Sequence, residues 1–176
     1  MLIELRFLND CLCQVEVIMR FAQGIEHVLE NQGSNLEEKR SAAEKPLDAL
    51  GSSLVNVVAI LNEYWESSER TEQLTRVLKK NYSRIDIVGK SAQKLSSLVK
   101  GRDDDSSEDE MVAKLKGVAH HLFVEAQIWK HRITGFDFET MGATPLKSTT
   151  WKAEEAYQKL VKEFEIEALP TEPTAH

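Results

Sequence analysis

The sequence predicts an all-α protein, an elongated antiparallel bundle of four to five helices. Apolar residues recur at spacings of three and four along most of the 176 residues, which is the period of one helix face. Glycine and proline number only eight and four, which disfavours a fold of many short strands and turns. The longest periodic segments would form helices about 40 Å long, and each must bury its apolar face against another helix.

Residues 3–31 allow two interpretations. Alternating apolar residues on both sides of Asn9-Asp10 fit a β-hairpin with a two-residue turn. A helical stripe instead continues unbroken across these two residues, and we favour this helix, with a weak point at Gly24 and a stop at Gly33. The stripe comprises Leu5, Leu8, Leu12, Val15, Met19, Ala22, Ile25 and Leu29.

A second helix is predicted to begin at Pro46, because the missing N–H of proline has no partner in the first turn of a helix. Before it, Ser34 and Glu37 have the spacing of a capping box, and the polar residues 36–45 fit either a short exposed helix or an ordered connector. The apolar face of this helix comprises Leu47, Leu50, Leu54, Val57, Val58, Leu61 and Trp65.

The segment Glu69–Gly101 has the clearest two-sided pattern, and we expect Gly101 to end it in a left-handed cap. Its apolar arc comprises Leu74, Val77, Leu78, Ile85, Val88, Ala92, Leu95 and Val99. A basic arc on roughly the opposite side comprises Arg76, Lys79, Lys80, Arg84, Lys90 and Lys94. Residues 69–102 hold nine Lys/Arg and three Asp/Glu, a net +6, so the rest of a chain with a total of −7 carries −13.

An acidic run at 103–110 follows this basic segment, with six acids in eight positions. Such a run predicts a solvated loop whose last acids favour the positive N-terminus of the next helix. Ser106 and Ser107 each precede an acid by three residues, a pattern that acidophilic kinases use, although a solubilising loop is the simpler interpretation. The fourth helix would bury Val112, Leu115, Ala119, Leu122, Ala126, Trp129 and Ile133.

Residues 135–149 break the helical period and form an apolar loop that either caps one end of the bundle or docks a partner. Its apolar members are Phe136, Phe138, Met141 and Leu146. A last helix at 150–168 would bury Trp151, Tyr157, Leu160, Val161 and Phe164. We therefore expect one helical domain at 1–169 and a flexible tail at 170–176.

No catalytic motif, cofactor-binding loop or metal-ligand spacing occurs in the sequence, so we expect neither an enzyme nor a cofactor. A weak enzyme or metal hypothesis would use His120, His121, Glu125 and His131. Cys11 and Cys13 diverge by about 200° on a helix, which predicts free thiols rather than a disulfide. Charges interrupt the apolar N-terminus, so we expect neither a secretory signal nor a membrane span. We therefore expect a cytoplasmic protein.

The sequence thus favours a non-enzymatic interaction domain, an adaptor or regulatory module that binds protein partners through a helix face and the 135–149 loop. The alternative is a protein that binds an anionic membrane surface through the basic arc. Binding of nucleic acid through the same arc is a weaker option. The net charge of −7 disfavours nucleic acid for the molecule as a whole. Self-association is left open.

Overall fold

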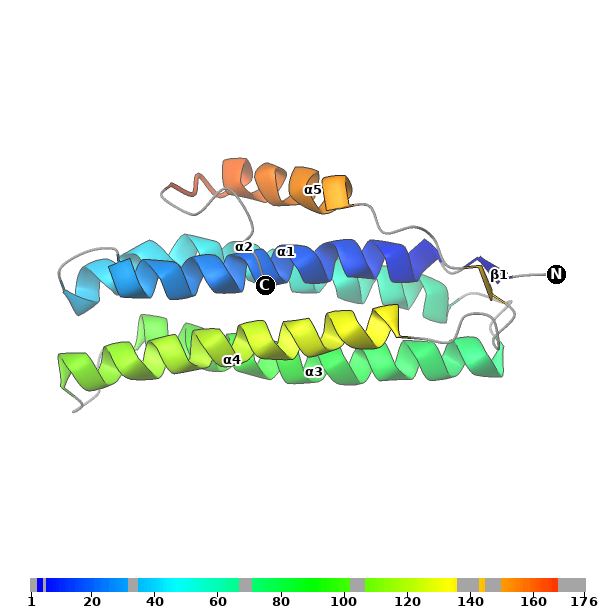
Figure 1. Cartoon of the computed structure of the whole chain (residues 1–176), viewed down its shortest axis with the longest axis horizontal. Helices are drawn as coiled ribbons and strands as arrows, with labels where there is room; N and C mark the ends of the chain where they lie inside the picture. Colours follow the sequence, from blue (N-terminus) through cyan, green and yellow to red (C-terminus); the bar gives the residue numbers. More distant parts are fainter. Residues whose placement is uncertain are drawn as a thin grey trace.

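The computed structural model describes residues 3–4, 6–31, 35–66, 71–101, 107–135, 143–144 and 150–167. These residues form five helices and two short strands: β1 (Ile3–Glu4), α1 (Arg6–Asn31), α2 (Leu36–Trp65), α3 (Glu72–Lys100), α4 (Glu108–Thr134), β2 (Ala143–Thr144) and α5 (Thr150–Glu163). Helices α1 and α3 each pack against both α2 and α4, so the first four helices alternate in direction around one core (Figure 1). The predicted all-α bundle is confirmed.

Helix α5 lies outside this four-helix bundle, along α1 (Figure 1). It has a few contacts with α2, whereas no contact with α3 or α4 occurs among the described residues. Helix α1 is therefore surrounded by α2, α4 and α5, and most of its circumference is buried. None of the helices in the described ranges combines the length and the apolar character that a bilayer crossing requires.

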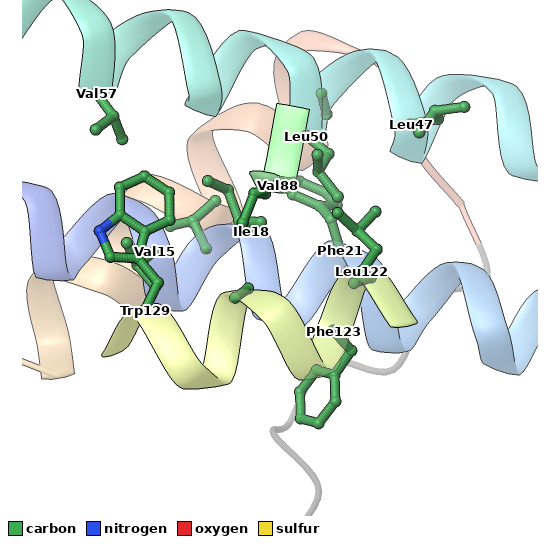
Figure 2. Packing of buried hydrophobic residues seen from close by; sticks show 14 of the residues in the cluster. Val15, Ile18, Phe21, Leu47, Leu50, Val57, Val88, Leu122, Phe123 and Trp129 are labelled. Atoms are coloured by element: carbon green, nitrogen blue, oxygen red, sulfur yellow. The ribbon is translucent and has the colours of Figure 1, made fainter. Parts of the chain in front are cut away.

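The core is formed by apolar side chains from all four bundle helices. Figure 2 shows Val15 and Ile18 of α1 on the side that faces Leu50 and Val57 of α2, with Val88 of α3 and Leu122 and Trp129 of α4. An aromatic contact joins α2 and α3, where the rings of Trp65 and Tyr82 lie edge to face with centroids 5.9 Å apart.

The N-terminal segment is helical across Asn9 and Asp10, so the hairpin interpretation is wrong. Residues ahead of α1 do form a strand, but its partner is distant in sequence. Ile3 pairs with Ala143 and Glu4 with Thr144 in a parallel two-residue ladder. A strand this short carries too few residues for an alternating pattern, and the sequence therefore did not reveal it.

Helix α2 begins ten residues before Pro46, so the prediction that this proline lies in a first turn is wrong. The N-cap is Asn35, whose Oδ1 accepts a hydrogen bond from the N–H of Glu38 at 2.9 Å. Proline removes one backbone donor from the helix. Burial of Ala43, Pro46 and Leu47 on the same face offsets this loss, since tertiary packing supplies most of the stability of a helix.

Helix α3 ends at Lys100 as expected, but Gly101 is not a left-handed cap. Its φ and ψ of −69° and 141° are extended, a conformation that any residue adopts. The requirement for glycine is steric, because a Cβ at this position would lie 2.8 Å from the carbonyl oxygen of Ser97. At the other end the helix begins at Glu72, where the Oγ1 of Thr71 accepts from the N–H of Leu74 at 3.1 Å.

The start of α4 and the end of α5 are capped in different ways. Ser107 caps α4, and the first turn carries Glu108, Asp109 and Glu110, as predicted from the positive charge of a helix N-terminus. Helix α5 ends at Glu163 rather than Ala168, in a Schellman motif where the Ile166 N–H donates to the Val161 carbonyl at 2.9 Å. The Trp151 side chain and residues 168–176, including the predicted tail, lie outside the described residues.

Two buried polar side chains join α3 to α4 inside the core. The Nε1 of Trp129 donates to the Oδ1 of Asn81 at 2.8 Å, and the Nδ2 of Asn81 donates to the Val77 carbonyl at 2.9 Å. Asn81 is 2% exposed and Trp129 is fully buried, so water cannot replace either partner. Asn81 belongs to the interior of the bundle although its side chain is polar.

Replacing Asn81 with leucine should therefore destabilise the protein by about 1–3 kcal/mol, because the buried indole N–H of Trp129 would lose this acceptor. The second substitution, Trp129→Phe, removes that donor, so the double variant should lose less than the sum of the two single variants. Urea unfolding of the four proteins measures this coupling. Ser83→Ala on the exposed side of α3 should change stability by less than about 0.5 kcal/mol. Strict additivity would contradict the predicted coupling.

Glu165 holds the left-handed position of the α5 cap with φ of 51°. A side chain at such a position costs about 1 kcal/mol, which glycine avoids. Glu165→Gly should thus raise the thermal midpoint of unfolding. The exposed Lys159 inside α5 provides the opposite control, since glycine there should destabilise by about 1 kcal/mol. A lower midpoint for Glu165→Gly would show that the cap is not strained.

Candidate functional site

The outer side of α3 is the most strongly charged surface of any described helix. Seven Lys/Arg and two Asp/Glu give α3 a net charge of +5. By the same count α1 and α2 each carry −2, and α4 and α5 carry zero. The opposite side of α3 is buried in the core through Leu74, Leu78, Val88 and Leu95, which fixes the orientation of the helix.

Five of the six residues of the predicted basic arc are exposed and define what we call the exposed basic face: Arg76, Lys79, Lys80, Lys90 and Lys94. Two of them have acids one turn earlier. Arg76 pairs with Glu72 at 3.2 Å, and Lys90 pairs with Asp86 at 3.0 Å. All four of these side chains are more than 60% exposed, so water screens both pairs. Such pairs contribute little to the stability of the fold.

The sixth residue, Arg84, is not part of this face. Its side chain is 12% exposed and turns toward α4, where Nη2 donates to the Oε2 of Glu125 at 2.6 Å and to the Glu125 carbonyl at 3.1 Å. The carboxylate of Glu125 is 16% exposed. Arg84 is therefore a structural link between α3 and α4. Helical periodicity gives an angle around one helix, and it does not say where the next helix lies.

Lys100 is also tied to the bundle rather than to the exposed basic face. Its Nζ lies 3.8 Å from Asp48 on α2. Both residues line a groove between the start of α2 and the end of α3, with Arg40, Glu44 and Glu108. The described lining contains both acidic and basic side chains, so this groove does not favour a ligand of either charge.

The histidines of the weak metal hypothesis are separated. His120 lies 3.4 Å from Glu26 on α1, and His121 lies 3.9 Å from Glu125. His131 is exposed near the end of α4. Among the residues that the structure describes, no three His, Cys, Asp or Glu side chains converge as a metal site would require.

Ser107 caps a helix, and the two cysteines are free thiols. The exposed Ser107 uses its Oγ to accept from the Glu110 N–H at 3.2 Å, and a phosphate there would lie beside the acids of the first turn of α4. Cys11 and Cys13 are free, as the sequence predicted. Burial, and then the charge of Asp10, raises the pKa of the Cys11 thiol, which makes it a poor nucleophile.

Several predicted site residues fall outside the described residues. These are Ser106 and the apolar members of the 135–149 loop: Phe136, Phe138, Met141 and Leu146. Their predicted roles as a phosphorylation site and a partner-docking loop stay predictions. Comparisons of the chain with protein-family models, with curated proteins and with solved structures find no match. The geometry and charge of the exposed basic face are therefore the basis for inferring its role.

Replacing Arg84 should cost far more stability than replacing an exposed cation of α3, because Arg84 is partly buried and pairs with Glu125. Arg84→Met should destabilise the protein by about 3–5 kcal/mol, because it leaves Glu125 charged and without its partner. The double variant Arg84→Met/Glu125→Leu should recover most of this loss. Lys79→Met, on the exposed basic face, should cost less than about 0.5 kcal/mol. Equal effects of Arg84→Met and Lys79→Met in urea unfolding would contradict this assignment.

Proposed function

We propose that this protein is a non-enzymatic interaction domain that binds an acidic surface of a partner protein through the exposed basic face of α3. The observation that carries the proposal is the contrast in charge. Five exposed cations lie on a helix of net +5 in a chain whose total is −7. Complementary charge of this kind raises association rates and selects partners.

The geometry of the face favours a protein over a lipid bilayer. From Arg76 to Lys94 the cations extend over about 27 Å of helix, and the packed core holds them in a fixed order. A membrane-surface helix would also insert apolar side chains. The apolar arc of α3 is buried, and Val55 on α2 is the one large hydrophobic residue exposed in the described ranges. The exposed side chains of α3 that a bilayer would meet are all polar or charged.

Charge reversal on this face tests the proposal. Lys79→Glu/Lys94→Glu should weaken partner binding about tenfold, or about 1.4 kcal/mol, since two attractive contacts become repulsive. The matched control is Lys159→Glu/Lys162→Glu on α5, because it changes the net charge by the same amount at exposed positions on another helix. The measurement is quantitative mass spectrometry of proteins retained from the native host by the wild type and by both variants.

A true partner should be retained by the wild type and by the α5 variant and depleted with the α3 variant, and it should have an acidic surface. Equal retention by all three proteins would refute a role for this face. Co-sedimentation with vesicles of phosphatidylcholine, with and without phosphatidylserine, is the parallel arm. Pelleting that needs phosphatidylserine and disappears only in the α3 variant would replace the protein partner with an anionic membrane.

A further inference from the structure

Helix α1 carries a second buried stripe beside the one that faces the centre of the four-helix bundle. Its main stripe includes Cys11, Val15, Ile18, Ala22, Ile25 and Leu29. Val17, Phe21 and Val28 lie about 100° further around the helix, and they are buried as well, with at most 1% exposure. A second stripe on one helix requires a further partner, and that partner is α5.

Helix α5 covers an outer surface of α1 with α2 at its edge, and this covered surface is called the groove beside α1. The buried residues of α5 have the spacing that a docked helix requires. Ala153, Tyr157 and Leu160 recur at i, i+4 and i+7 and are buried. The rings of Tyr157 and Phe21 lie with centroids 4.8 Å apart. On the α2 side, the Nζ of Lys45 donates to the carbonyl of Glu165 at 3.4 Å. The groove is thus formed by α1 with α2 at its edge.

Arg20 gives this groove a polar anchor. Its side chain is 9% exposed and forms an ion pair with Glu154 of α5. Its guanidinium also lies over the ring of Tyr157, 3.6 Å from the centroid, in a cation–π contact. One arginine therefore recognises an acid and an aromatic residue that are three positions apart on a helix. This pair gives the groove selectivity beyond its apolar surface.

Helix α5 packs on the outside of the four-helix bundle. Helices α1 to α4 pack around their core with α5 touching only α1 and α2. A helix of 14 residues is marginal in water by itself, so α5 depends on the groove for its order. Segments of this kind open at a lower free energy than the core does. Opening would uncover Val17, Phe21 and the charge of Arg20.

We infer that the groove beside α1 is a helix-binding site, and that in trans it takes α5 of a second copy of this chain. In such a dimer each groove would hold the helix of the other copy with the same Arg20–Glu154 and Phe21–Tyr157 contacts. Exchange of identical elements needs no new surface. Attachment of α5 to its own bundle gives it an effective concentration of about millimolar, which favours the monomer in dilute solution. The exchanged dimer forms where the contact between α5 and the groove is stronger between two chains than within one chain.

Charge reversal across the Arg20–Glu154 pair tests this inference with the full chain. In Arg20→Glu and in Glu154→Arg, the groove and the attached α5 carry like charges. Mixing the two variants restores opposite charges in both grooves, but only if each chain takes the other's α5. The mixture should form a 1:1 dimer of twice the 20.0 kDa monomer mass, with a dimer dissociation constant at least tenfold below that of either variant alone.

The double variant Arg20→Glu/Glu154→Arg is the matched control, because it restores the opposite charges within one chain. It should be a monomer with a higher thermal midpoint than either single variant. Light scattering after size-exclusion chromatography measures the masses. A mixture that stays monomeric while the double variant regains stability would overturn the inference, since the groove would then accept only its own α5. Equal dimerisation of each single variant alone would overturn it too.

Discussion

The burial of α1 on most of its circumference is the constraint on which the rest of the structure depends. Its apolar stripes require α2 and α4 on the core side and α5 on the outer side. Helix α3 lies diagonally opposite α1, and the described helices that pack along its length are α2 and α4. No other described helix packs along its outer side, which carries the charged residues. The exposed basic face is a consequence of this placement.

Polar contacts fix how the helices align along one another, which apolar stripes alone leave loosely defined. Arg84 with Glu125 and Asn81 with Trp129 join α3 to α4 less than one helical turn apart along α3. The Oγ of Ser53 on α2 donates to the Oε1 of Gln14 on α1 at 2.6 Å. A shift of either pair of helices would leave a buried donor or charge without a partner, at a cost of several kcal/mol for the ion pair.

The bundle could be predicted because the 3.6-residue period extends over most of the chain, and that period depends only on local sequence. The errors came from tertiary packing. Pro46 is a strong local signal for a helix start, yet burial of its neighbours keeps α2 helical on both sides. Arg84 and Lys80 lie close together around the circumference of α3, but α4 packs beside Arg84, and its Glu125 forms an ion pair with Arg84. The second stripe of α1, which comprises Val17, Phe21 and Val28, could not be assigned from the sequence because its burial depends on α5 packing beside α1.

The two surfaces singled out by this geometry lie on opposite sides of the bundle, α3 below and α5 above in Figure 1. Helix α3 packs against α2 and α4 and not against α5 among the described residues, so exchange of α5 would leave both basic faces of a dimer exposed. A dimer would then present two copies of a face whose single contacts are weak and screened by salt. Bivalent binding strengthens such contacts without any new interaction. The groove beside α1 would in this way control the strength with which α3 holds an acidic partner.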